Sequence, residues 1–345
     1  MPLTQAQALD MLRSDDLIGI GMEADLVRRR LHPGNVVSYQ VDRNINYTNI
    51  CTEYCSFCAF YRPVGSPEGY LQPLESIYRK IDETLALGGT GILMQGGLHP
   101  DLKIDYYENL LSSIKGRYPR LHLHCFSAPE VLNIAELSGL SLRDAILRLR
   151  DAGLDSIPGA GAEILDDEVR YRIARLKCST QEWIAVHRTA HQLGLRTTAT
   201  MMFGCGETLE HRVRHLERLR QLQEETGGFT AFIPWMFQPT HTSLGRTIKE
   251  EATAVDYLKT LAVSRCYLDN ILNVQASWLT PGHKICQIAL RFGGNDVGSI
   301  LIEENVVSAA GCTNTSTEEQ LRRLIADAGF RPVKRDTLYR TYFLN

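Results

Sequence analysis

The feature of this sequence that most constrains its fold is the alternation of short strand-like segments with helix-like segments along most of its length. The strand-like segments are rich in apolar and β-branched residues and are bounded by turn-forming residues. We expect strands at residues 44–50, 91–95, 121–127, 155–158, 196–203, 228–237, 273–278 and 297–302. Strands that alternate with helices indicate a parallel α/β sheet with helical crossovers, and eight such units match a (β/α)8 barrel of the TIM type. An open, doubly wound sheet is the alternative fold class.

Helix signals lie between these strands. Pro73 is expected to open one helix, which Gly88 can close. The capping boxes Ser179-Thr-Gln-Glu182 and Ser316-Thr-Glu-Glu319 predict two further helix starts. Residues 208–225 are predicted to form a long charged helix, because leucine and valine recur along one of its faces.

Residues before the first expected strand read as one or two additional helices that end near Pro33-Gly34. We therefore assign residues 1–40 to an N-terminal helical extension and residues 41–345 to a barrel domain that forms a single structural unit. The 37 basic and 40 acidic residues give a net charge of −3, so no nucleic-acid partner is expected. Residues 1–16 lack the continuous apolar core typical of a signal peptide, and no stretch approaches about 20 apolar residues, so we expect a cytoplasmic protein without a membrane partner.

Three of the nine cysteines lie close together, in Cys51-Thr-Glu-Tyr-Cys55-Ser-Phe-Cys58, directly after the first expected strand. Thiolates are soft ligands that suit zinc and iron–sulfur clusters. A structural zinc site normally takes four protein ligands, and a second Cys-x-x-Cys pair is absent. Three thiolates can hold three irons of a [4Fe–4S] cluster and leave the fourth iron open. A zinc site with a distant fourth ligand and a redox-switched disulfide are the alternatives.

The spacing Cys-x-x-x-Cys-x-aromatic-Cys resembles the motif of the radical S-adenosylmethionine (SAM) superfamily. The resemblance implies that Cys51, Cys55 and Cys58 ligate a [4Fe–4S] cluster, whose open iron binds the amino and carboxylate groups of SAM. It also implies that one electron cleaves SAM to methionine and a 5′-deoxyadenosyl radical. An external one-electron donor, such as flavodoxin or ferredoxin, would supply that electron.

The resemblance also indicates which residues bind SAM. A Gly-rich segment after the second strand suits the ammonium group of SAM, although a tight turn is an alternative role for its glycines. A guanidinium group suits the carboxylate of SAM. The residues assigned to SAM in this way are Phe57, Gln95, Gly96, Gly97, Ser127, Glu163, Arg170 and Met202.

Longer strings narrow the resemblance to the menaquinone and deazaflavin branch of the superfamily. They include Asn44-Ile-Asn-Tyr-Thr-Asn49, Met94-Gln-Gly-Gly-Leu-His-Pro100 and Glu303-Glu-Asn-Val-Val-Ser-Ala-Ala-Gly311. Ser156-Ile-Pro and Phe60-Tyr-Arg62 are most similar to the cyclic dehypoxanthinyl futalosine synthases of this branch. That similarity implies a step of menaquinone biosynthesis by the futalosine route, with dehypoxanthine futalosine as the substrate.

In the implied reaction the adenosyl radical takes the hydrogen from C4′ of the ribose, and the carbon radical adds to the benzoate ring. An electron and a proton then leave and restore aromaticity. Aminofutalosine synthase and the FO (deazaflavin) synthase component are alternatives in the same class. A non-catalytic zinc or iron–sulfur binding protein is the alternative from a different class.

The substrate needs a base for the departing ring proton and a partner for its carboxylate. An imidazole suits the base, so we predict a catalytic role for His124 on the third expected strand. Asp296 and Glu304, which flank the eighth strand, are the next catalytic candidates. Arg291 is the predicted substrate-binding cation. His122 shares the strand parity of His124, so the two imidazoles are expected on one face.

Overall fold

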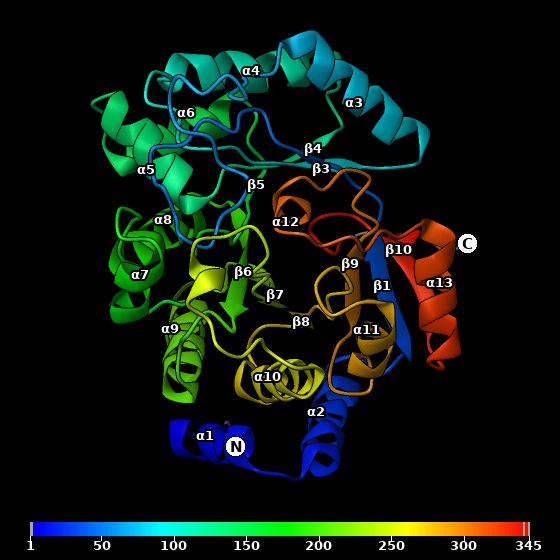
Figure 1. Cartoon of the computed structure of the whole chain (residues 1–345). Coiled ribbons are helices and arrows are strands. Elements are labelled where there is room, and N and C mark those ends of the chain that lie inside the picture. Colours follow the sequence, from blue (N-terminus) through cyan, green and yellow to red (C-terminus); the bar gives the residue numbers. More distant parts are fainter. Residues whose placement is uncertain (1–2, 341, 344–345) are drawn as a thin grey trace.

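The computed structural model describes residues 3–340 and 342–343, which form a ring of short parallel strands surrounded by helices (Figure 1). The described strands are β1 (Val36–Gln40), β2 (Asn44–Ile45), β3 (Gly91–Met94), β4 (His122–Cys125), β5 (Ser156–Ile157), β6 (Arg196–Phe203), β7 (Phe229–Met236), β8 (Asn273–Val274), β9 (Asp296–Ser299), β10 (Arg331–Arg335) and β11 (Tyr342–Phe343). Each of the eight expected strands is present, and most are shorter than expected.

The strands form two sheets that join into one ring. The larger sheet has the sequential order β2-β3-β4-β5-β6-β7-β8, and the smaller has the order β11-β10-β1-β9. A parallel bridge between Gln275 and Asp296 connects β8 to β9, and β1 runs into β2 after three residues. The sequential order has no point at which it reverses, so the sheet is not doubly wound. The predicted α/β barrel class is confirmed.

Two parts of the smaller sheet were not predicted from the sequence. β1 pairs in parallel with both β9 and β10, so the expected N-terminal extension, residues 1–40, includes a whole strand of the barrel. β10 has the sequence Arg-Pro-Val-Lys-Arg, which carries neither an apolar run nor a β-branched pattern. It pairs with β1 from Arg331 to Lys334, and the guanidinium of Arg335 is buried against Asp296 on β9.

Helices cover the outside of the ring and follow most strands (Figure 1). They are α1 (Gln5–Arg13), α2 (Leu17–Leu31), α3 (Leu74–Ala86), α4 (Ile104–Arg117), α5 (Ala128–Leu137), α6 (Leu142–Ala152), α7 (Asp167–Ile173), α8 (Thr180–Gln192), α9 (Leu209–Thr226), the 3-10 turn η1 (Leu244–Arg246), α10 (Ala254–Tyr267), α11 (His283–Ala289), α12 (Val306–Ala309) and α13 (Glu318–Asp327). The capping box predicted at Ser179 opens α8. The last capping box is formed by Thr317 and Gln320, one residue later than predicted.

The N-terminal helices lie against the barrel wall. α1 packs on α9 and α10, and α2 packs on α10. The predicted N-terminal helices are therefore present, and they end before Val36. Among the described residues, no helix combines the length and the apolar content that a membrane crossing requires.

Strand parity decides which side chains face the interior of the ring. The Tyr47 ring lies outside, edge-on to Tyr107 of α4 at 5.9 Å, so Asn44 and Asn46 face inward. Asn44 pairs with Leu93 of β3, and Leu93 pairs with His124 of β4. Register partners of parallel strands share a face, so the interior is lined by polar groups as well as by apolar ones.

Candidate active site

The three cysteines lie on one loop that begins after β2, at the carboxyl end of the barrel strands. The side chains of Cys51 and Cys55 are each 8% exposed, and Cys58 is half-buried. The backbone NH of Cys51 donates to the Arg62 carbonyl at 3.0 Å, and that of Cys58 donates to the Cys55 carbonyl at 3.1 Å. Catalytic groups of barrels lie at this end, so the position of the loop agrees with a catalytic role.

The donor set of this loop fits an iron–sulfur cluster better than a single ion. Burial raises the pKa of the Cys51 and Cys55 thiols, so binding a metal must displace their protons. A zinc ion lies about 2.3 Å from each sulfur ligand and would hold three sulfurs close together. Among the described residues, the groups whose ligand atoms all lie within 4.8 Å of one another do not include these cysteines. A cluster that binds each sulfur at a different iron tolerates that wider spacing.

Gly96 and Gly97 pack the turn after β3 against the cysteine loop. A methyl group on Gly97 would overlap the Ile50 carbonyl and come within 2.8 Å of Cys51 Cβ. A methyl group on Gly96 would come within 2.7 Å of the Tyr47 ring. Close packing therefore requires both glycines, independently of any ligand. Gln95 is half-buried with interior parity, and its side-chain amide makes no hydrogen bond within the described part of the chain.

Glu130 on α5 connects three strand ends. Its carboxylate accepts hydrogen bonds from the Gly96 NH at 2.9 Å, the Tyr47 hydroxyl at 2.8 Å, and both the NH and the hydroxyl of Ser127. Burial raises its pKa, and these hydrogen bonds oppose that shift. The hydroxyl of Ser127, a predicted SAM contact, is thus already engaged by Glu130. Sequence reasoning missed Glu130, although the capping pattern Ser-x-x-Glu gave a local signal for it.

A buried ion pair lies beside the cysteine loop. Lys177 Nζ lies 2.7 Å from Glu163 Oε1 and 5.1 Å from the centre of the Phe57 ring. Burial opposes the charge of Lys177, but the carboxylate of Glu163 outweighs this effect, so the pKa of Lys177 is raised. Glu163 itself has a φ of 43°, a strained backbone conformation for this residue type. Lys177, which the sequence did not signal, therefore lies against both Phe57 and Glu163, two of the residues assigned to SAM.

The guanidinium of Arg170 is fully engaged in hydrogen bonds to backbone carbonyl groups. It donates to the carbonyl oxygens of Gly161 at 3.0 Å, Ala162 at 2.7 Å and Cys178 at 2.9 Å from Nε. With the side chain 3% exposed and its donors occupied, Arg170 supports the loop after β5. Met202 is fully buried on β6, and its NH donates to the Glu163 carbonyl at 2.9 Å, which places it beside the same loop.

Two imidazoles share one hydroxyl inside the barrel. Ser156 Oγ lies 2.6 Å from His124 Nδ1 and 2.7 Å from His122 Nε2. One hydroxyl has one proton, so it donates to one ring and accepts from the other. Burial lowers the pKa of His122 to about 4 and that of His124 to about 3, so both rings are neutral at pH 7. His124 Nε2 makes no hydrogen bond within the described residues. It is the unbonded end of the hydrogen-bonded series formed by His122, Ser156 and His124.

Two of the other predicted catalytic residues serve the fold. Asp296, fully buried at the amino end of β9, pairs with Arg335 Nε at 2.6 Å and accepts from the Ser38 hydroxyl at 2.5 Å. Glu304 accepts three backbone NH groups at the start of α12, from Val306 at 2.9 Å and from the next two residues at 2.8 Å. The structure does not bring either carboxylate to the cysteine loop.

Arg291, the predicted substrate-binding cation, is exposed and lies away from these groups. Its guanidinium stacks 4.2 Å from the centre of the Phe330 ring and donates to the Ala328 carbonyl at the end of α13. This placement does not support contact with a substrate in the barrel. Its position directly after a helix gave no sign of the direction in which the side chain points.

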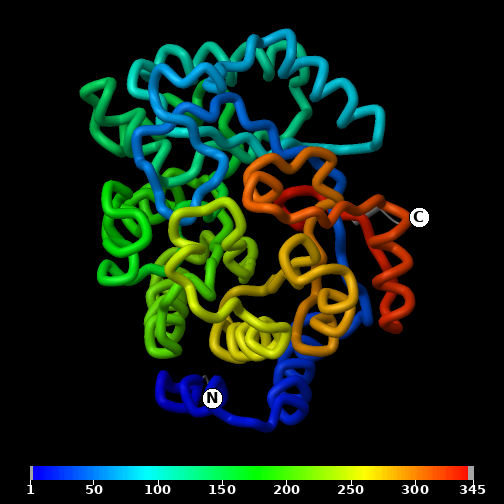
Figure 2. Tube along the Cα trace, in the orientation of Figure 1, coloured from blue at the N-terminus to red at the C-terminus, as the bar shows by residue number. Residues whose placement is uncertain are grey.

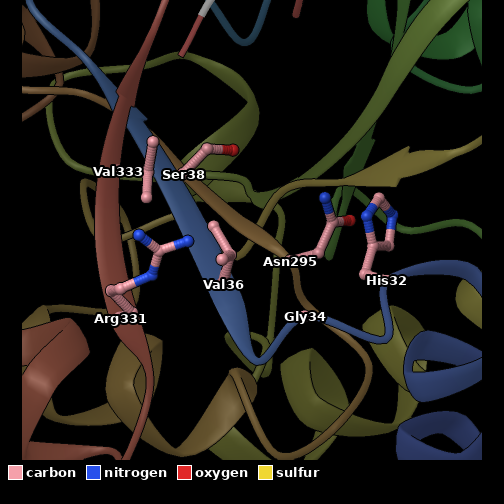
Figure 3. Close-up of a pocket in the computed structure, with 7 residues that line it drawn as sticks. All are labelled: His32, Gly34, Val36, Ser38, Asn295, Arg331 and Val333. Atoms are coloured by element: carbon pink, nitrogen blue, oxygen red, sulfur yellow. The ribbon is translucent and has the colours of Figure 1, made fainter. Parts of the chain in front are cut away.

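A pocket of about 330 Å³ opens at the opposite end of the barrel (Figure 3). It is lined by His32, Gly34, Val36, Ser38, Asn295, Arg331 and Val333, which lie at the amino ends of β1, β9 and β10. The carboxyl ends, where the cysteines lie, are on the other side of the Asp296–Arg335 pair. This pocket is therefore separate from the candidate active site.

Comparisons with known proteins agree with this geometry. Residues 45–219 match the model of the radical SAM superfamily, and residues 226–344 match the CofH/MqnC C-terminal region. The cyclic dehypoxanthine futalosine synthase of Halalkalibacterium halodurans is 47% identical over 98% of this chain and 90% of its own length. The enzyme of the same name from Streptomyces coelicolor is 44% identical, over 98% of this chain and 85% of its own length.

Relatives with another activity are also similar to this chain. The 5-amino-6-(D-ribitylamino)uracil–L-tyrosine 4-hydroxyphenyl transferase of Methanothermobacter thermautotrophicus is 42% identical over 98% of this chain and 94% of its own length. Among solved structures, methylornithine synthase superposes with a TM-score of 0.73 at 19% identity, covering 96% of this chain and 94% of that one. At that identity, the likeness concerns the fold.

Proposed function

The chain belongs to the radical SAM superfamily, and we propose that it is a cyclic dehypoxanthine futalosine synthase of the futalosine route to menaquinone. The observation that carries the proposal is its 47% identity, over nearly the whole chain, with an enzyme of that name. The cysteine loop at the carboxyl end of the barrel and the polar side chains of the barrel interior support the same assignment.

A [4Fe–4S] cluster with SAM, when bound, supplies a 5′-deoxyadenosyl radical by one-electron cleavage of the sulfonium. Cys51, Cys55 and Cys58 would hold three irons of that cluster. Gln95 is free to bind a polar group of SAM, and Phe57 and Met202 offer apolar surface to its adenine. Lys177 is better suited than Arg170 to the carboxylate of SAM, because within the described residues its ammonium group donates one hydrogen bond, to Glu163, and has three protons to donate.

The barrel interior contributes confinement and a base. A primary carbon radical attacks nearly any adjacent C–H bond, so a substrate enclosed by strands is protected from side reactions. His124 is neutral and its Nε2 has no hydrogen-bond partner in the part of the chain that the structure describes, so this atom can accept the proton that leaves the substrate ring. Ser156 and His122 orient the ring of His124 through Nδ1 and can pass the proton onward.

The experiment uses the full chain, reconstituted anaerobically with iron and sulfide and supplied with SAM and dithionite. Dehypoxanthine futalosine should give 5′-deoxyadenosine and a product lighter by two hydrogen atoms. A parallel reaction contains L-tyrosine and 5-amino-6-(D-ribitylamino)uracil, the substrates that the name of the 42% identical relative states. Turnover of that pair alone, or a product that retains the adenosyl group, would contradict the assignment.

A further inference from the structure

The interior of the barrel is accessible, although the wall around it is tightly packed. Along β3, β4, β6 and β7, side chains with outward parity are buried, and those with inward parity are mostly half-buried. The half-buried side chains are Leu93, His122, His124, Thr198, Thr200, Thr230, Ile233 and Trp235. An eight-stranded barrel of this type is usually filled by its own side chains. Here they leave a space that they line, which we call the barrel chamber.

Two polar residues at the junction of β1 and β2, Asp42 and Asn44, face the barrel chamber. Arg43, which lies between them, points outward, because its Nη1 donates to Glu83 of α3 at 2.7 Å. The Arg43 carbonyl accepts from the Leu93 NH at 2.9 Å, so this segment continues the sheet. Side chains alternate along an extended segment, so Asp42 and Asn44 both point inward.

Both residues carry an oxygen atom that the described chain does not satisfy. Oδ1 of Asp42 and Oδ1 of Asn44 are buried, and neither has a hydrogen-bond partner among the described residues. Asp42 is half-buried as a residue, and Asn44 is 6% exposed. Arg335 attracts the Asp42 carboxylate but is itself paired with Asp296 at 2.6 Å. A buried acceptor without a partner destabilises the folded chain, so two of them on one face indicate a site that another molecule completes.

The hydroxyl groups of the neighbouring chamber wall are already engaged with the backbone. The Thr198 hydroxyl accepts from the Gly159 NH at 2.9 Å, and the Thr200 hydroxyl donates to the Gly159 carbonyl at 2.8 Å. The Thr230 hydroxyl donates to the Thr197 carbonyl at 3.1 Å. Asp42 and Asn44 differ from these residues because their oxygen atoms remain without partners in the described part of the chain.

The wall across the barrel chamber from Asp42 and Asn44 is apolar. Phe232 of β7 points outward, towards His215 of α9, with the two ring centres 6.3 Å apart. Ile233 and Trp235 therefore point inward. Figure 2 shows the blue trace of the β1–β2 junction across the ring from β7, which agrees with the strand order. A molecule in the chamber meets hydrogen-bond acceptors on one side and apolar surface on the other.

We propose that Asp42 and Asn44 bind hydroxyl groups of the substrate's ribose and thereby position its C4′ for hydrogen abstraction. The inference deepens the proposed function and rests on it, because that function places a ribose in the barrel. Hydroxyl groups donate hydrogen bonds, and an ionised carboxylate accepts them at two oxygen atoms. Such charge-assisted bonds are stronger than neutral ones, and carboxylates bind the ribose hydroxyls of dinucleotides in the same way. The benzoate ring then faces Ile233 and Trp235.

The position of the two residues suits this role. Asn44 pairs in register with Leu93, and Leu93 pairs with His124, so Asn44 and the proposed base lie in one layer of the barrel. The cysteine loop follows β2 directly, so the layer lies beside it. Burial raises the pKa of Asp42 to about 6, so the carboxylate is mostly ionised at pH 7. Polar groups that fix the sugar here determine which C–H bond faces the radical.

The first test asks whether Asp42 serves the fold. Its pKa is raised in the folded chain, so the ionised carboxylate destabilises that chain at pH 7, and Asp42→Asn removes this effect. We expect Asp42→Asn to unfold at the same denaturant concentration as the wild type, or at a higher one. Unfolding at a lower concentration would assign Asp42 to the fold and overturn the proposal.

The second test removes the two partners of the proposed hydrogen bonds separately and together. Wild type and Asp42→Ala, each with its cluster and SAM but without reductant, are titrated with dehypoxanthine futalosine and with its analogue lacking the 2′ and 3′ hydroxyl groups. Asn44→Ala is the second variant. The matched control is Asp82→Ala, because Asp82 lies on α3 outside the barrel, where it pairs with Arg117 at 3.1 Å.

We expect Asp42→Ala to raise the dissociation constant of the natural substrate by about 10- to 100-fold. For the analogue the increase should be about threefold or less, because variant and analogue lack the same hydrogen bonds. Asn44→Ala should show the same pattern to a smaller extent, and Asp82→Ala should bind both molecules as the wild type does. Equal increases for the two molecules, or no increase for either, would overturn the proposal. A wild type that does not convert dehypoxanthine futalosine with dithionite contradicts the proposed function itself, which is a separate outcome.

Discussion

Replacement of Asp296 by asparagine is predicted to destabilise the fold and to leave the chemistry intact. The Asp296 carboxylate is fully buried and receives Nε and Nη2 of Arg335 at 2.6 and 2.9 Å. The Arg335 side chain is 5% exposed, so the substitution leaves a buried guanidinium without its counter-charge. Removing one partner of such a pair costs about 3–5 kcal/mol of the free energy of unfolding.

Two further variants separate this cost from other effects. Arg335→Met removes the cation, and the double variant removes both charges, so the double variant should lose less than the sum of the single variants. Asp105→Asn breaks an ion pair in which the Asp105 side chain is 81% exposed. That control should change the free energy of unfolding by about 1 kcal/mol or less.

The assay has two parts, a denaturant titration of the free energy of unfolding and SAM cleavage by the folded protein. Asp296→Asn should unfold at a lower denaturant concentration and cleave SAM at a normal rate when fully folded, because Asp296 lies at the amino end of β9. A stability change as small as that of Asp105→Asn would refute the argument from burial. Normal stability with loss of cyclised product would restore Asp296 as a catalytic residue.

Three other predictions follow from the site. Cys55→Ala should prevent the chain from retaining iron and cleaving SAM while its circular dichroism stays unchanged; iron retention with SAM cleavage would contradict the role of this loop. Lys177→Met should weaken equilibrium binding of SAM and shift the electron paramagnetic resonance signal of the reduced cluster, whereas Lys177→Arg should restore much of the binding; no change in either measurement would remove Lys177 from the SAM site. His124→Gln should still form 5′-deoxyadenosine but less cyclised product. Because burial lowers the pKa of His124 from 6.5 to about 3, the unfolded chain binds a proton below pH 6.5 that the folded chain does not. Between pH 7 and pH 5 the wild type should therefore lose about 2 kcal/mol more stability than His124→Gln, and parallel pH profiles in denaturant titrations would refute this.

Patterns formed by residues close together in the sequence were sufficient to predict the eight expected strands, the start of α8 and the metal-binding chemistry of the cysteine loop. Short apolar segments bounded by turn residues gave all eight predicted strands, since burial within a sheet imposes that pattern wherever the strand lies. The capping box at Ser179 placed the start of α8, because its hydrogen bonds join residues three positions apart. The spacing of Cys51, Cys55 and Cys58 indicated a cluster because the three thiolate ligands and the residues that join them all lie within eight positions.

Only the tertiary structure decided which charged side chains belong to the site. Asp296 and Arg335 are 39 residues apart, and their pairing, which removes Asp296 from the catalytic candidates, follows from β10 lying next to β1. Lys177 lies over the ring of Phe57, which is distant in the sequence, and Arg170 on α7 donates to carbonyl groups of the loop after β5. The energy of a buried charge depends on partners that are distant in the sequence. The tertiary structure of the barrel therefore decides whether a charged side chain is a ligand, a member of a structural ion pair or a surface group.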